Sequence, residues 1–293
     1  MKQISESRVL FLGAGAMSES MIKGLLEARL IPAAQIIVCN RRNTARLQDL
    51  QQRYAVQVIQ DKRTACREAD MIVLAVKPFD VVAALQEIAP YLSAQQLIIS
   101  VAAGISTAAI EACCAKSIPV IRAMPNTSSS VQASATALCA GRQATAEHLD
   151  LAQDLFAAIG ISVLVEEEQM NAVTGLSGTG PAYFYYVTEA LLAAGQACGL
   201  SAETSRVLLV QTLYGAARML QETGKDPEEL RLQVTSPNGT TMAGIAVLDQ
   251  GDTRLLLKRA VQAATSRALE MGQQIENAFA QLQASGRSRN VIQ

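Results

Sequence analysis

The chain has 293 residues, half of them hydrophobic, and a formal net charge of −1 at pH 7. This size allows two domains with substantial cores, whereas the near-zero charge argues against nucleic acid as the main partner, because phosphate neutralisation needs a basic face. No apolar run approaches the length of a membrane span, and the N-terminal MKQISESR lacks the apolar region of a secretory signal. We therefore expect a cytoplasmic protein without membrane contact.

The cysteines and the histidine point away from metal chemistry. The six cysteines show no CxxC spacing and lie mostly in apolar stretches, which predicts free thiols. His148, the single histidine, lies in the helix-like AEHLDLAQDLF, where a position at the surface or at a helix start is expected. One histidine leaves few options for a zinc site, so no metal is predicted.

The first half of the chain alternates short apolar runs with amphipathic stretches, as βαβ units require. The apolar runs are hydrophobic at nearly every position, which suits parallel strands covered on both faces. This pattern predicts an α/β Rossmann-type domain over residues 1–165. The expected strands are 9–12, 36–39, 71–76, 97–101 and 119–123, with a last pair at 135–139 and 162–165, and the first helices are 17–28 and 44–54.

The second half reads as helix throughout. An all-α domain is expected over residues 166–284, followed by a polar, frayed tail at 285–293. The segment Ala182 to Cys198 carries Glu189 as its only charge, and a helix apolar all round must be buried on several sides. A subunit interface, and hence a dimerisation domain, is predicted there. The expected helices are 182–198, 202–222, 227–234, 242–250 and 253 to about 283.

A glycine-rich turn follows the first strand and opens the first helix, which is the context of a dinucleotide-binding signature. The third glycine of GxGxxG is replaced by Ser18, which is still small enough for the helix to approach the strand. A tight turn without a ligand is the alternative. The candidate cofactor residues of this turn are Gly13, Ala14, Gly15, Ala16 and Met17.

The end of the second strand distinguishes the two nicotinamide cofactors. An NAD site would carry a carboxylate there for the ribose hydroxyls, but the chain offers the donors Asn40, Arg41 and Arg42 instead. Such donors suit a 2′-phosphate and favour NADPH. The alternative is a solvated basic loop.

Two further strand ends carry candidate cofactor residues. Ala75, Val76, Lys77 and Pro78 end a strand at the carboxyl edge of the sheet, where ligands bind in open α/β folds. Lys77 could face the ribose and phosphates, or it could be an exposed strand-end lysine. Asn126 follows another strand and could offer its amide beside the nicotinamide, although asparagine is also ordinary in turns.

Two polar segments, LSGTGPAYFYY and VTSPNGTTMAGIAVLD, read as loops that open helices and offer backbone N–H groups to a small anion. Reduction of a carbonyl would need a proton donor, yet no lysine occurs between Lys116 and Lys225. A protonated imine becomes a neutral amine on accepting hydride and needs no strong acid. The Ser236 hydroxyl and the N–H groups of Gly239 to Thr241 would bind the carboxylate of such a substrate and orient it. The alternative is that this segment only caps the helix and binds no ligand.

With these motifs in place, the chain resembles pyrroline-5-carboxylate reductase, the NADPH-dependent last enzyme of proline synthesis. GAGAM, AVKP, RAMPNT, LSGTGPAY and PEELRLQVTSPNGTTMAGIAVLD carry the resemblance over nearly the whole length. Asn238 stands where the family usually has glycine, and asparagine tolerates the left-handed conformation. The resemblance implies catalysis by Thr241, whose hydroxyl would lie nearest the imine, and substrate binding by Ser177, Gly178, Thr179, Gly180, Ser236, Gly239, Thr240 and Thr241.

The resemblance also implies a homodimer that can assemble further into a decamer. It predicts NADP(H) as cofactor and reduction of 1-pyrroline-5-carboxylate to L-proline as the reaction. Two alternatives stay open: a reductase of another cyclic imino acid, since one methylene discriminates only about 10- to 200-fold, and a non-catalytic NADP-binding regulatory paralogue.

Overall fold

The computed structural model describes residues 3–41, 43–114 and 117–289. The chain divides into two compact units, one made of residues 1–179 and 263–293 and the other of residues 180–262.

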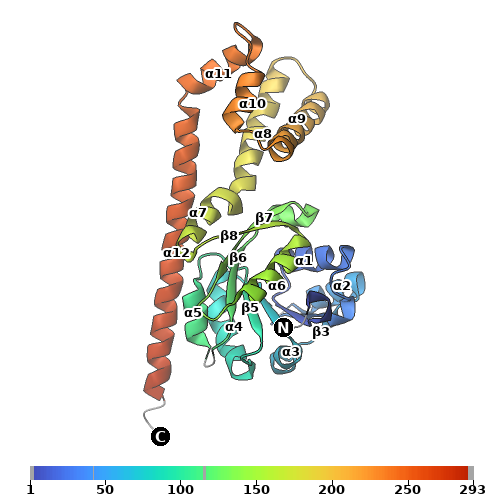
Figure 1. Ribbon diagram of the computed structural model, residues 1–293, viewed down its shortest axis with the longest axis vertical. Helices are drawn as coiled ribbons and strands as arrows, with labels where there is room; N and C mark the ends of the chain where they lie inside the picture. Colours follow the sequence, from blue (N-terminus) through green and yellow to red (C-terminus); the bar gives the residue numbers. More distant parts are fainter. Residues whose placement is uncertain (1–2, 42, 115–116, 290–293) are drawn as a thin grey trace. The chain divides into compact units, whose positions relative to one another are not determined.

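The first unit is built on an eight-stranded sheet with the order β3-β2-β1-β4-β5-β6-β7-β8 (Figure 1). Neighbouring strands are parallel except β6 and β7, which pair antiparallel. This arrangement confirms the Rossmann-type prediction, and each strand expected from the sequence is present within two residues of its predicted ends. The strands are β1 Val9–Leu12, β2 Ile36–Cys39, β3 Gln57–Val58, β4 Met71–Leu74, β5 Leu97–Ser100, β6 Val120–Met124, β7 Ser134–Ala140 and β8 Gly160–Leu164.

Alternate residues of the strands enter two separate hydrophobic clusters, one on each face of the sheet. Val9 and Phe11 of β1 belong to the cluster that contains residues of α1, α2 and α6. Leu10 and Leu12 belong to the cluster that contains residues of α3, α4 and α5. The helices are α1 Ala16–Glu27, α2 Thr44–Tyr54, α3 Lys62–Glu68, α4 Val81–Ile88, α5 Thr107–Cys113 and α6 Ala146–Ala157.

The last part of the chain is helical, as predicted. Ser201 caps α9 by accepting a hydrogen bond from the Thr204 N–H, and Asp226 caps α10 in front of Pro227. The last helix continues to Arg289, so residues 285–289 are helical, where the polar composition suggested a frayed tail. These elements are α7 Met170–Val173, α8 Gly180–Ala197, α9 Ala202–Thr223, α10 Pro227–Gln233, α11 Thr240–Gln250 and α12 Thr253–Arg289.

Helix α8 leaves large aromatic side chains exposed within a single chain. Phe184 is 60% exposed, Tyr185 62% and Tyr186 75%. The charge-poor segment noted in the sequence therefore forms a helix with an apolar surface that this chain does not bury. Adjacent exposed aromatic rings of this kind mark a surface for contact with another protein.

The C-terminal part of α12 belongs to the first unit, and its backbone approaches the loop after β5 closely. A Cβ on Gly272 would lie 2.9 Å from the carbonyl oxygen of Gly104. Nearby, Ser106 Oγ donates to Glu276 Oε1 at 2.9 Å, and Ile275 is buried. Glycine at 272 therefore permits the contact that holds this loop, at the carboxyl end of a central strand.

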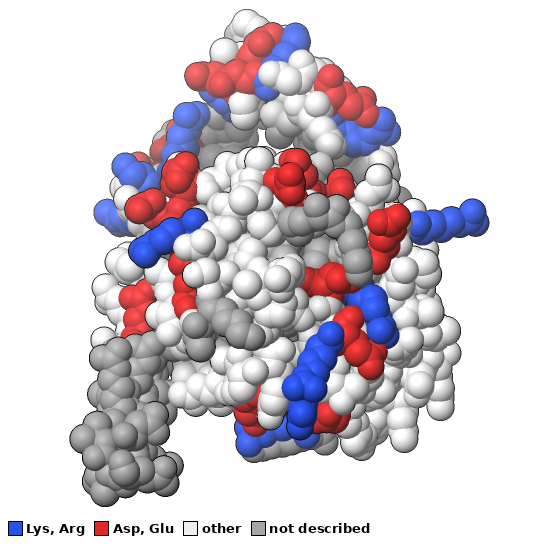
Figure 2. All heavy atoms as spheres, turned by 60° about the horizontal axis from the view of Figure 1, so that its bottom comes forward, with Lys and Arg blue, Asp and Glu red and all other residues white. Residues whose placement is uncertain are grey.

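The remaining features concern charge, thiols and membrane contact. In the view of Figure 2, acidic and basic side chains lie interspersed. All six cysteines are free, and His148 forms a capping box with Thr145 at the start of α6, as its position suggested. Within the described residues, no helix is long and apolar enough to cross a membrane, and no group of three His, Cys, Asp or Glu side chains is placed to hold a metal ion.

Candidate functional site

A cavity of about 380 Å³ lies in the first unit, where β1, β2 and β4 end. It brings together residues that the sequence analysis took from three separate motifs. Ala16, Met17, Pro78 and Asn126 do not line it, and Arg42 lies outside the described residues. The predicted cofactor residues in its wall are Gly13, Ala14, Gly15, Asn40, Arg41, Ala75, Val76 and Lys77.

Gly13 ties two of these motifs together. Its φ is +118°, and a Cβ at this position would overlap the carbonyl oxygen of Ala75. Its N–H donates to the carbonyl oxygen of Cys39 at 2.9 Å, while the Ala75 N–H donates to Leu12. Only glycine allows the ends of β1 and β4 to approach this closely.

The start of α1 is open toward a ligand. Gly15 is the N-cap residue and provides no side-chain cap, and a Cβ built on it would meet no atom within 4 Å. Ser18 is fully buried, and its Oγ donates to the carbonyl oxygen of Gly13 at 2.9 Å. The serine that replaces the third glycine therefore stabilises the turn, and an uncapped helix start of this kind suits a phosphate group.

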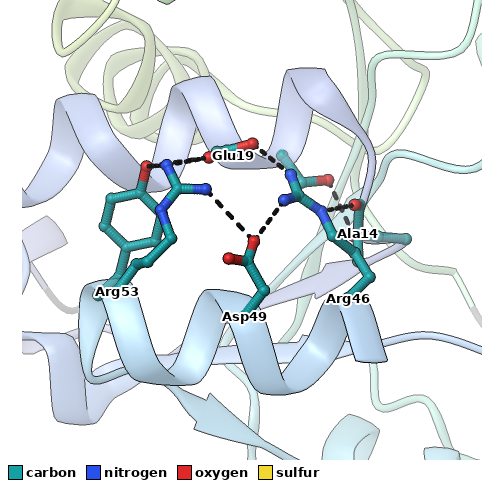
Figure 3. A network of polar contacts seen from close by, with 8 residues as sticks. Ala14, Glu19, Arg46, Asp49 and Arg53 are labelled. Carbon is teal, nitrogen blue, oxygen red and sulfur yellow. Dashed lines mark hydrogen bonds and ion pairs between the residues drawn. The ribbon is translucent and has the colours of Figure 1, made fainter. Parts of the chain in front are cut away.

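Arg46, which no sequence motif singled out, also lines the cavity and belongs to a polar network in which Glu19 and Asp49 lie between Arg46 and Arg53 (Figure 3). Its Nε donates to the carbonyl oxygen of Ala14 at 3.2 Å, and its two terminal nitrogens pair with Glu19 and with Asp49. Arg53 pairs with the same two carboxylates. The network holds α2 against the first turn of α1 and fixes the glycine-rich turn between them.

The electrostatics of Glu19 agree with this structural role. Burial acts to raise the pKa of the carboxyl, but hydrogen bonds from Arg46 and Tyr54 and the charges of Arg46 and Arg53 outweigh burial and lower it. Glu19 is therefore a stable anion, and the guanidinium of Arg46 already has three partners. Arg46 positions the cavity wall, while Arg41 and Lys77 supply further positive charge there.

The segment that carries Ser177 differs from the expectation of a loop with free N–H groups. Residues Thr174–Gly178 form a π-helical segment between α7 and α8. The Thr179 N–H donates to the carbonyl oxygen of Thr174 at 2.9 Å, and the Thr179 hydroxyl donates to the same oxygen at 2.7 Å. The prediction of a loop with free N–H groups is therefore wrong, because local hydrogen bonds continue the helix through this segment. Single π-turns of this kind occur often at functional sites.

Asn126 is connected to this π-helical segment. Its Nδ2 donates to the carbonyl oxygen of Ser177 at 3.1 Å, and its Oδ1 accepts from the Ser128 N–H at 3.1 Å. Asn126 is 9% exposed. The structure thus brings Asn126 and Ser177 together, which sequence alone did not predict.

A buried ion pair anchors the chain just before α7. Arg122 of β6 is 4% exposed, and its Nη1 pairs with Glu167. The other carboxylate oxygen of Glu167 accepts from the Thr107 N–H at 3.0 Å and from the Thr107 hydroxyl at 2.7 Å. Burial acts to raise the pKa of Glu167, but these hydrogen bonds and the charge of Arg122 lower it. Glu167 is held as an anion that joins β6, α5 and the entry to α7.

The SPNGTT segment lies in the second unit and forms the turn before α11. Asn238 has a φ of 57°, so the residue that departs from the usual glycine adopts the expected left-handed conformation. Gly239 is the N-cap of α11, its N–H donates to the Ser236 carbonyl oxygen at 3.0 Å, and no side chain of the described residues caps this helix. The serine and threonines of SPNGTT therefore do not cap α11, and Thr240 and Thr241 are its first two residues.

Comparison with known proteins places this geometry in a family. A family model described as pyrroline-5-carboxylate reductase dimerisation matches residues 167–271, and one described as NADP oxidoreductase, coenzyme F420-dependent, matches residues 8–104. Pyrroline-5-carboxylate reductase 1 of Bacillus spizizenii is 41% identical over 94% of this chain and 93% of its own length. The chain belongs to the pyrroline-5-carboxylate reductase family. The resemblance read from GAGAM, AVKP and SPNGTT is thereby confirmed.

Solved structures agree with this assignment. A pyrroline-5-carboxylate reductase from Coxiella burnetii superposes with a TM-score of 0.85 at 38% identity, covering 90% of this chain and 98% of that one. The Plasmodium falciparum pyrroline carboxylate reductase, solved with NADP bound, gives a TM-score of 0.82 at 28% identity over 92% of this chain and 99% of its own. The match therefore includes both the sheet and the helical part of the chain.

Proposed function

We propose that this protein reduces 1-pyrroline-5-carboxylate to L-proline with NADPH, the last step of proline biosynthesis. The observation that carries the proposal is the 41% identity to a pyrroline-5-carboxylate reductase over 94% of the chain, which includes both the cofactor cavity and the SPNGTT segment. A regulatory relative without turnover would be free to lose these segments, yet both are intact in this sequence.

The cavity residues fit NADP(H). The open, uncapped start of α1 at Gly15 suits the pyrophosphate, and Asn40 and Arg41 supply donors for the 2′-phosphate where an NAD site would need a carboxylate. When bound, the cofactor supplies the hydride. Ala16, Met17, Pro78 and Arg42 remain candidate contacts from the motif, and the amide of Asn126 acts by holding Ser177.

The substrate is an imino acid, and the chain's task is to orient it. We assign its carboxylate and ring nitrogen to Ser236 and to the first turn of α11, with the Thr241 hydroxyl nearest the imine. A protonated imine turns into a neutral amine when it accepts hydride, so placement and fixed dipoles suffice without a lysine or histidine acid. The proposed substrate-binding residues are Ser177, Gly178, Thr179, Gly180, Ser236, Gly239, Thr240 and Thr241.

The proposal also covers the organisation of the protein. Residues 1–165 bind the cofactor, residues 166–284 bind substrate and form the dimer, and residues 285–293 are a polar tail. The exposed Phe184, Tyr185 and Tyr186 of α8 support burial in a homodimer. Further assembly of dimers into a decamer and a cytoplasmic location complete the proposal.

The test is NADPH oxidation by the purified protein with 1-pyrroline-5-carboxylate, compared with NADH and with the six-membered cyclic imine. Fast oxidation with NADPH and the five-membered ring supports the assignment. Preference for the six-membered imine would identify a different imino acid as substrate. Tight NADPH binding without oxidation of either imine would contradict the enzymatic assignment.

Thr241 allows the substrate assignment to be tested at one atom. Replacing it with alanine removes a hydrogen bond to a charged group, worth about 1.5–3 kcal/mol, so turnover should fall about 10- to 100-fold. NADPH affinity should stay nearly unchanged, and Thr241→Ser should recover most of the rate because it keeps the hydroxyl. Full turnover in Thr241→Ala would refute the role.

A further inference from the structure

One wall of the cofactor cavity is an ion pair between two helices that carry no part of the dinucleotide motif. Lys62, the first residue of α3, pairs through Nζ with Oε2 of Glu87 in α4. Both residues line the cavity together with Asn40 and Arg41. The side chain of Lys62 is 18% exposed and that of Glu87 42%. A carboxylate thus lies in the wall of a cavity that takes a polyanion, with a lysine held beside it.

The backbone before Lys62 is fixed next to the end of β2. The Ile59 N–H donates to the carbonyl oxygen of Val38 at 3.3 Å, and the thiol of Cys39 donates to the carbonyl oxygen of Gln60 at 3.7 Å. Asp61 then caps α3 by accepting from the Thr64 N–H at 3.0 Å. These contacts hold Lys62 beside the β2 end, where the 2′-hydroxyl side of a bound nucleotide lies in this fold.

The charges on this wall favour a phosphate and also limit its binding. Arg46 already contacts Glu19, Asp49 and a carbonyl oxygen, so its charge is largely balanced. Among the described residues, Lys62 forms its ion pair with Glu87, which is the more exposed of the two. A phosphomonoester carries about −1.5 to −2 charges at pH 7 and is therefore a stronger partner for the ammonium than one carboxylate.

We propose that Lys62 is a specificity-determining residue for NADPH, binding the 2′-phosphate in exchange for Glu87. Glu87 holds the lysine in place when no phosphate is present and weakens phosphate binding by competition and by repulsion. This inference rests on the proposed use of NADPH. Removing the lysine should weaken the preference for a nucleotide with a 2′-phosphate, whereas removing the carboxylate should strengthen it.

The test is calorimetric binding of two nucleotides that differ only in the phosphate of interest, adenosine 2′,5′-bisphosphate and adenosine 5′-monophosphate, to the full-length protein. Lys62→Met should weaken bisphosphate binding about 10-fold or more, while the monophosphate changes less than about 2-fold. Glu87→Gln should strengthen bisphosphate binding about 3-fold or more by removing a nearby like charge. Lys62→Arg should keep most of the preference because it keeps the cation.

Arg63→Met is the matched control, since it removes a positive charge from the adjacent position of the same helix, outside the cavity lining. It should leave both affinities nearly unchanged. If Lys62→Met weakens both nucleotides equally, or if Glu87→Gln leaves the bisphosphate unaffected, the pair only joins α3 to α4 and the inference is wrong. Imine reduction with NADPH is measured on the same proteins to keep that result separate from the proposed function. The proposed function fails if wild type binds NADPH but reduces neither imine, whatever the two variants do.

Discussion

The buried pair of Arg122 and Glu167 gives the sharpest prediction about stability. Glu167→Gln keeps the shape and an acceptor for Thr107 but removes the negative charge. Arg122, 4% exposed, would then be a buried cation, and its Nη2 already lacks a hydrogen-bond partner among the described residues. Breaking a fully buried pair costs about 3–5 kcal/mol. Because the Glu167 side chain is 28% exposed, we expect about 2–3 kcal/mol.

The assay is urea unfolding at one fixed protein concentration, since oligomer dissociation makes apparent stability depend on concentration. The double variant Arg122→Met/Glu167→Met should lose less stability than Glu167→Gln, because replacing both charges with apolar groups removes the unpaired cation. A Glu167→Gln protein within about 0.5 kcal/mol of wild type would show that the pair of Arg122 and Glu167 does not stabilise the fold.

The same pair predicts a pH dependence. The pKa of Glu167 in the folded protein is lowered from its ordinary value of 4.5, so its contribution is fully present above that value. It is lost as pH falls from 4.5 through the lower folded pKa, because the unfolded chain binds the proton first. The stability gap between wild type and Glu167→Gln should therefore narrow in acid, and a gap that stays constant or widens below pH 4.5 would contradict the assigned ion pair.

Two glycine substitutions test the close backbone contacts. Gly13→Ala places a Cβ against the Ala75 carbonyl at a φ of +118°, so we expect a loss of about 2 kcal/mol or more and weakened NADPH binding, measured by thermal unfolding and fluorescence titration. Gly272→Ala brings a Cβ to 2.9 Å from the Gly104 carbonyl oxygen and should cost about 1–2 kcal/mol, despite the better helix propensity of alanine. Gln273 is exposed on the same helix, so Gln273→Ala should leave stability unchanged. If Gly272→Ala is as stable as Gln273→Ala, the loop after β5 moves to accommodate the added Cβ.

Much of the fold follows from local patterns that the sequence displays directly. The strands β1, β2 and β4 are apolar at every position because helices cover both faces of the sheet, and β1 and β2 begin and end at the predicted residues. The helices α3, α4 and α5 were not predicted individually. They have only seven, eight and seven residues, and the strand β3 that precedes α3 has two. Segments this short contain too few residues to show the hydrophobic periodicity of a helix or a strand.

The cavity residues that belong to a sequence motif could be predicted. Those that reach the cavity only through tertiary contacts could not. Gly13 and Gly15 belong to a recognisable turn, and Arg41 was selected because a carboxylate is missing at that position. Lys62 follows a two-residue strand, and Arg46 is one of several charges on an exposed helix, so nothing local distinguished them. The roles of the substrate residues from Ser177 to Thr241 stay predictions.

The π-helical segment at Thr174–Gly178 shows the limit of composition as a guide. Glycine, serine and threonine together suggested a loop with free N–H groups. In the structure the hydroxyls of Ser177 and Thr179 donate to carbonyl oxygens of the preceding turn, which the sequence does not reveal.

The proposed reaction is hydride transfer from NADPH to the imine carbon of 1-pyrroline-5-carboxylate. The most direct measurement is to supply NADPH deuterated at the transferable position and to analyse the product by mass spectrometry and NMR. We predict L-proline carrying one deuterium at the ring carbon that was doubly bonded to nitrogen. Proline without deuterium, or NADPH left unoxidised by protein that binds it, would show that this protein does not transfer hydride to the imine.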